Sequence, residues 1–157
     1  MFDPWEAEEW AREEAQRNAR ADLLAFTQYT LPEYEAAWFH HYMSDRLTSV
    51  LRSDVKRLII QMPPRRGKTE LASRRLPAYA LGLNPNEQII ACSYADGLAS
   101  RINRDVQRIV MSGEFNTLFP RTTLNSKHAV TDSDVSYLRN ATCLLYTSPS
   151  PRDGLLS

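Results

Sequence analysis

The residues with the clearest chemical potential lie in the stretch QMPPRRGKTEL, residues 61–71. Gly67, Lys68 and Thr69 match the second half of the phosphate-loop pattern G-x-x-x-x-G-K-[ST], while Met62 stands where the first glycine belongs. In such a loop, backbone N–H groups and a helix dipole face the phosphates, the lysine adds charge, and the hydroxyl ligates Mg²⁺. The stretch therefore predicts binding of ATP with Mg²⁺.

Two prolines precede this motif. Pro63 and Pro64 have no N–H to offer a phosphate, but they stiffen the entry of the loop. The donors that matter most come after them and are intact. We expect cofactor contacts from Arg65, Arg66, Gly67, Lys68, Thr69 and Glu70, with Lys68, Arg65 and Arg66 also acting in catalysis and Thr69 on the metal. The alternative is an accidental turn.

Basic residues gather around the motif. The chain carries 19 Lys plus Arg and 19 Asp plus Glu, yet residues 52–75 contain eight bases and two acids. This local excess suits a polyanionic ligand, and the alternative is a solvated surface. The bases are Arg52, Lys56, Arg57, Arg65, Arg66, Lys68, Arg74 and Arg75.

The elements that must position the loop follow from hydrophobic periodicity and turn residues. Helices are predicted over 3–26, 33–54, 67–82 and 96–115, and short apolar strands over 55–64 and 87–95. The order strand, loop, helix, strand, helix is typical of a parallel α/β sheet. In the second helix we expect Trp38, Tyr42, Leu47 and Leu51 to share one apolar side.

The two cysteines, Cys92 and Cys143, indicate no disulfide framework and no zinc cluster. Cys92 lies in the apolar run QIIACSYA, which predicts a buried free thiol. No apolar run is long enough for a membrane span, and the acidic N-terminus is unlike a signal peptide. We therefore expect a soluble intracellular protein.

Residues 26–124 resemble the N-terminal ATPase region of the terminase large subunit of tailed phages. The resemblance is carried by RLIIQMPPRRGKTELASRRLPAYALGLNP, QIIACSYADGLASRINRDVQRIV, YEAAWFHHYMSDRL and LFPRTTL, and most specifically by P-P-R-x-G-K-[ST]-E-L. It implies a P-loop NTPase of the additional-strand class: an α/β fold whose parallel sheet, incomplete here, is flanked by helices and follows an N-terminal helical segment. Terminases of this type commonly lack the first glycine of the loop.

The resemblance also implies roles for individual residues. Lys68 and Thr69 correspond to phosphate and Mg²⁺ ligands, and Arg65 or Arg66 to the arginine that contacts the γ-phosphate. The segment WFHHY sits where the family places an adenine-side contact, although Trp38 and Tyr42 are equally good core residues.

The family further implies a linked RNase H-like nuclease and the coupling of ATP hydrolysis to translocation of double-stranded DNA into a prohead. Its partners would be that DNA, the portal protein, the small terminase subunit and further copies in a homo-oligomeric ring, in the host cytoplasm and without a membrane. Two alternatives stay open: a helicase-like P-loop ATPase, and a non-catalytic nucleotide-binding α/β module.

Hydrolysis also needs a second carboxylate for Mg²⁺ and a general base, which in this class follow an apolar strand. No such strand is apparent, because Asp96, Asp132 and Asp134 are better explained as helix-start or turn residues. We therefore expect three parts: a helical segment at 1–32, a truncated ATPase domain at 33–142, and a tail at 143–157. The 157-residue chain should bind ATP without hydrolysing it.

The tail CLLYTSPSPRDGLLS resembles a translated sequencing adapter, and its composition shifts abruptly to Ser, Pro and Leu. We assign no function to Cys143, Arg152 or Asp153. The tail is expected to be unpacked, or to complete a strand only by accident near Leu144 and Leu145.

Overall fold

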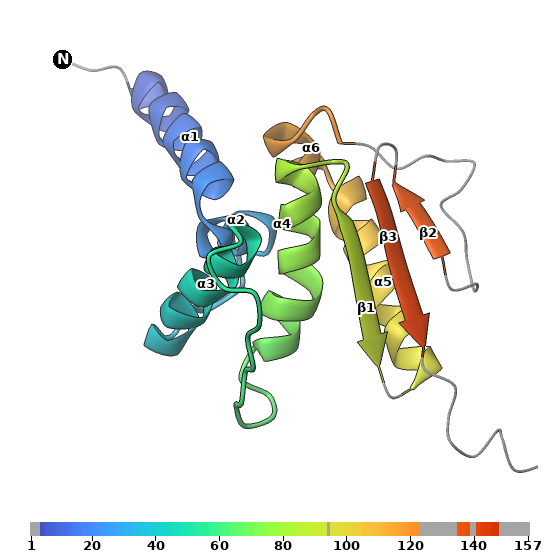
Figure 1. Cartoon of the computed structure of the whole chain (residues 1–157). Coiled ribbons are helices and arrows are strands. Elements are labelled where there is room, and N and C mark those ends of the chain that lie inside the picture. Colours follow the sequence, from blue (N-terminus) through green and yellow to red (C-terminus); the bar gives the residue numbers. More distant parts are fainter. Residues whose placement is uncertain (1–3, 94, 123–134, 139–140, 148–157) are drawn as a thin grey trace, which may run out of the picture. The chain divides into compact units, whose positions relative to one another are not determined.

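The computed structural model describes residues 4–93, 95–122, 135–138 and 141–147. It forms two compact units, Met1–Tyr79 and Ala80–Ser157, so that the boundary falls inside a helix. The elements, in chain order, are α1 (Pro4–Ala21), α2 (Leu23–Thr30), α3 (Trp38–Leu51), the π-helix η1 (Thr69–Arg75), α4 (Leu76–Leu83), β1 (Gln88–Ser93), α5 (Asp96–Met111), α6 (Gly113–Leu118), β2 (Val135–Leu138) and β3 (Ala141–Thr147) (Figure 1).

The long helix predicted over 3–26 is two helices, because the chain breaks at Asp22. This residue is extended (φ −133°, ψ 135°), and its carboxylate accepts a 2.7 Å hydrogen bond from the Ala25 N–H. It is therefore the N-cap of α2. Behind the cap, Phe26 is fully buried and its ring lies 5.3 Å from that of Tyr79, which places α2 at the core of the first unit.

The apolar side predicted for the helix over residues 33–54, which corresponds to α3, is wrong. In α3, Trp38 and Tyr42 are 81% and 60% exposed, and the buried face consists of His40, Met43, Ser44 and Leu47. This face follows the helical spacing i, i+3, i+4, i+7. Trp38 and Leu47 lie on nearly opposite sides of a helix, so the mixed spacings of four and five could not build one buried stripe.

The predicted fold class is wrong as well. Residues 55–64 form no strand, and Ile59 is 85% exposed. Helix accounts for 66% and strand for 5% of the described chain up to residue 122, where β1 is the single strand and no sheet forms. A P-loop core needs a strand that leads into the loop from the middle of a parallel sheet. Here the chain before the loop contains Pro63 and Pro64, and no described strand pairs with it.

The strand β1 pairs with a segment near the end of the sequence. β3 pairs with it in parallel and β2 pairs with β3 in antiparallel fashion, giving the order β1-β3-β2. Leu144 lies opposite Ile90 and Leu145 opposite Ala91, so a strand does form near the two leucines of the tail. The adapter origin of the tail stays a prediction. Asp132, Asp134, Arg152 and Asp153 lie outside the described residues.

The second unit packs helices around aromatic rings. Its buried side chains include Val106, Val110, Phe115 and Phe119, and the two phenylalanine rings lie 5.2 Å apart. A Cβ at Gly82 would come within 2.4 Å of the Phe119 ring, so only glycine permits this close approach of helix and ring.

One side of β1 is uncovered in this unit. Exposed and half-buried residues alternate along the strand; Ile90 is 63% exposed, and Cys92 is an exposed free thiol. The prediction that Cys92 is buried is therefore wrong. Among the described helices, none is both long and apolar enough to cross a membrane.

Candidate phosphate-binding loop

The loop, residues 64–68, has an unusual backbone. Arg65 and Gly67 have positive φ angles of 61° and 73°, whereas Lys68 is right-handed at −52°. Left-handed conformations are disfavoured for residues with a Cβ, by about 1–2 kcal/mol, so Arg65 is strained and Gly67 is not. An alternation of left- and right-handed residues turns neighbouring N–H groups toward one side, as in the backbone nests that bind anions.

A helix begins directly after the loop, as predicted. η1 and α4 follow one another without a break from Thr69 to Leu83 (Figure 1). The Leu71 N–H donates to the Gly67 carbonyl at 3.0 Å, which closes the first turn. The N–H groups ahead of that bond, at the start of a helix, have no acceptor within the helix. The donors predicted from the motif are thus at a helix N-terminus.

A buried histidine of α3, His40, contacts the backbone of the loop. His40 Nε2 lies 3.1 Å from the Arg66 carbonyl oxygen, and His40 Nδ1 accepts a 2.9 Å hydrogen bond from the Ala37 N–H at the start of α3. A Cβ at Gly67 would lie 2.8 Å from His40 Nε2 and 2.9 Å from the Tyr34 hydroxyl oxygen. Gly67 is therefore required twice, by its φ angle and by its neighbours.

Tyr34 and His40 were not predicted as site residues from the sequence. The resemblance implies an adenine-side contact for the WFHHY segment as a whole, and nothing in the residue pattern distinguishes His40 from His41. The structure removes the core alternative for Trp38 and Tyr42, since both are exposed, and the Arg46 guanidinium lies 5.0 Å from the Tyr42 ring centre. The adenine contact itself stays a prediction.

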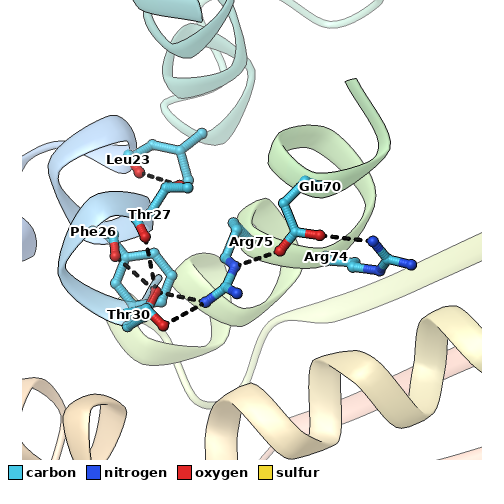
Figure 2. A network of polar contacts seen from close by, with 7 residues as sticks. All are labelled: Leu23, Phe26, Thr27, Thr30, Glu70, Arg74 and Arg75. Carbon is cyan, nitrogen blue, oxygen red and sulfur yellow. Dashed lines mark hydrogen bonds and ion pairs between the residues drawn. The ribbon is translucent and has the colours of Figure 1, made fainter. Parts of the chain in front are cut away.

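The Glu70 side chain points into a network of arginines (Figure 2). Its carboxylate forms ion pairs with Arg74 at 2.7 Å and with Arg75 at 2.8 Å (Figure 2). Arg75 also donates to the carbonyl and the hydroxyl of Thr30, at 3.2 Å and 2.7 Å, and its side chain is only 8% exposed. The network joins η1 to α2, so Glu70 anchors the helix behind the loop.

The electrostatics of Glu70 match this anchoring role. Burial pushes the pKa of Glu70 upward, but hydrogen bonds from Arg74 and Arg75 and the charges of both arginines outweigh burial and lower the pKa overall. Glu70 is therefore ionised near neutral pH, and its charge is compensated.

The basic cluster divides into two groups. Arg74 and Arg75 are occupied by Glu70, and Lys68 is half-buried at the N-cap of η1. The remaining bases are exposed: Arg52, Lys56, Arg57, Arg65 and Arg66. Thr69 is exposed as well. The loop thus presents two arginines and a hydroxyl to solvent, with Lys68 at the start of the helix.

The described residues contain no group of three or more His, Cys, Asp or Glu side chains that could hold a metal ion. Thr69 is the predicted metal ligand, and a hydroxyl suits Mg²⁺ only beside the oxygens of a bound phosphate. No protein family, curated protein or solved structure matches this chain.

Proposed function

We propose that the loop and the start of η1 bind the triphosphate of ATP together with Mg²⁺. One observation carries the proposal: two left-handed residues, Arg65 and Gly67, stand immediately before a helix whose N-cap is Lys68. Backbone N–H groups, a helix dipole and a cation then point to the same place. This combination suits a compact anion of high charge.

Each residue of the loop has a distinct role. Gly67 allows the phosphate to approach the backbone, and the Lys68 ammonium adds a charge beside it. Arg65 or Arg66 reaches the γ-phosphate from the exposed side of the loop. Thr69 supplies one oxygen to Mg²⁺, and phosphate oxygens and water complete the shell. The fit to the phosphates is supported by Gly67, Lys68 and one of the two loop arginines, and the fit to Mg²⁺ by Thr69 alone.

We further propose that the chain is the ATP-binding portion of a terminase large subunit that couples ATP hydrolysis to DNA packaging. The P-P-R-x-G-K-[ST]-E-L motif and the loop backbone support this, whereas the sheet does not. The proposed partners are double-stranded DNA, the portal protein, the small terminase subunit and further copies of the same chain.

Binding without turnover is the expected behaviour of the 157-residue chain. Glu70, the carboxylate next to the loop, is held by two arginines, and the described residues contain no cluster of metal-binding side chains. We therefore assign no described residue as the base for a water beside the γ-phosphate.

The test is a titration with a fluorescent ATP analogue, with and without Mg²⁺. Lys68→Ala should weaken binding about 30- to 1000-fold, corresponding to about 2–4 kcal/mol for a charge–phosphate contact. Lys56→Ala is the matched control, because Lys56 is an exposed lysine of the same cluster outside the loop. It should change affinity less than about threefold. Equal binding by the wild type and Lys68→Ala would refute the proposal.

A further inference from the structure

His40 is bonded through both ring nitrogens to backbone groups of opposite character. The Ala37 N–H can only donate, so Nδ1 must carry a lone pair. The Arg66 carbonyl can only accept, so Nε2 must carry the proton. One neutral tautomer satisfies both contacts, and it links the start of α3 to the loop.

The surroundings keep the ring in this position. His40 is 6% exposed, and its ring lies 4.3 Å from that of Phe39 and 5.2 Å from that of Tyr34. The Tyr34 hydroxyl is buried without a hydrogen-bond partner among the described residues, and it lies against Gly67 together with Nε2. A shift of the ring would therefore change the space around Gly67.

We propose that His40 is a positioning residue for the loop: its neutral ring holds the Arg66 carbonyl and thereby keeps Gly67 left-handed, and protonation of the ring releases the loop. The positioning of the loop by His40 is inferred from the contacts alone. Its effect on ATP binding rests on the function proposed above.

Protonation of the ring would place two hydrogen-bond donors opposite each other. A charged imidazole has an N–H on both nitrogens, so Nδ1–H would face the Ala37 N–H. That contact is lost, the ring turns, and the bond from Nε2 to the Arg66 carbonyl is broken with it. Both the start of α3 and the loop are then freed.

Among the described residues, the ionisable groups near the ring include those of Tyr34, Glu70 and Arg66. Burial and the charge of Glu70 raise the pKa of Tyr34, and the arginine partners lower the pKa of Glu70. The Arg66 guanidinium stays charged throughout. The neighbour His41 is an exposed histidine outside these contacts, which makes it the natural control.

The tautomer is tested on the unaltered chain. Two-bond ¹H–¹⁵N spectra at neutral pH should show His40 with an unprotonated Nδ1 and a protonated Nε2; His41→Gln assists assignment. The opposite tautomer, or rapid exchange between the two, overturns the proposal.

The hold on the loop is tested without nucleotide, by trypsin cleavage after Arg65, Arg66 and Lys68. His40→Phe removes both hydrogen bonds, of which only the one to the Arg66 carbonyl reaches the loop. Loss of that one bond should speed cleavage in the loop roughly fivefold relative to cleavage after the exposed Arg108. His40→Gln can accept and donate at similar positions and should restore protection, and His41→Gln should match the wild type. Unchanged cleavage in His40→Phe overturns the proposal.

Nucleotide binding against pH completes the test. On acidification, the affinity of the wild type and of His41→Gln should fall more than that of His40→Gln, which has no ring to protonate. If no variant binds ATP but cleavage still follows His40, the proposed function fails and the positioning role stands. If ATP binds with the same pH profile in the wild type and His40→Gln, the positioning role fails and the function stands.

Discussion

The residues that hold the loop differ in kind from those that the loop presents. The holding residues, Thr30, Tyr34, His40, Glu70 and Arg75, are buried or half-buried. All but Tyr34 form side-chain hydrogen bonds to one another or to backbone groups, and the Tyr34 hydroxyl lies against Gly67. The presented residues, Arg65, Arg66, Lys68 and Thr69, are exposed or half-exposed. Arginines adjacent in the sequence to the motif thus serve opposite purposes: Arg75 supports the fold, whereas Arg65 and Arg66 are open to a ligand.

This division implies a separation of effects. Removing one member of a buried ion pair leaves an uncompensated charge in a poor solvent, whereas an exposed charge contributes little to stability. Changes at holding residues should lower the free energy of unfolding. Changes at presented residues should alter affinity and leave unfolding almost unaffected.

The largest expected effect on stability is that of Arg75→Met. It removes the bonds to Glu70 and Thr30 and should lower the free energy of unfolding by about 3–5 kcal/mol, as for a broken buried pair. Urea denaturation measures the change, and Arg57→Met, at an exposed arginine, should stay within about 0.5 kcal/mol. Similar losses in the two variants would remove the distinction between holding and presented residues.

Glu70→Gln should cost about 2 kcal/mol at pH 7, since two charge-assisted hydrogen bonds become weaker. Because folding lowers the pKa of Glu70, its stabilisation is complete above the unfolded value of about 4.5 and is lost as the pH falls further. The difference between wild type and variant, measured by urea denaturation, should therefore shrink below about pH 4. A difference that grows on acidification would contradict the assigned pKa direction.

Gly67→Ala should affect both stability and binding, because Gly67 is part of the loop and lies against the holding residues His40 and Tyr34. The positive φ angle alone should cost about 1–2 kcal/mol, and the new Cβ would displace His40 and Tyr34. We expect lower stability and weaker binding of the ATP analogue together. Gly97→Ala is the control, since a Cβ there meets no atom within 4 Å. Full affinity in Gly67→Ala would show that the loop backbone is not needed for binding.

The smallest effect is expected at Ile59, which the sequence placed in a buried strand. It is exposed, so Ile59→Thr should change the free energy of unfolding by less than about 0.5 kcal/mol. Val106→Thr, at a buried position of similar shape, should cost about 1–3 kcal/mol because it buries a hydroxyl. A large loss in Ile59→Thr would restore the case for a buried strand before the loop.

Two similar apolar runs show what could be predicted from the sequence about strand formation. Leu58–Ile59–Ile60 and Ile89–Ile90–Ala91 both predicted strands, and only the second lies in one. β1 has a partner, β3, whose backbone groups pair with its own, whereas residues 55–64 have none among the described strands and end in two prolines. Hydrophobic character makes a strand possible, but pairing decides whether it forms.

The sequence by itself determined the local features of this protein. Gly67, Lys68 and Thr69 predicted a loop that leads directly into a helix, and this feature depends on residues close together in the chain. The tertiary structure decided which residues those features contact. That Arg75 is buried, that His40 reaches the Arg66 carbonyl, and that Trp38 faces solvent all depend on packing between segments distant in sequence. Such contacts are chosen by mutual fit and pairing, and no spacing within a single segment encodes them.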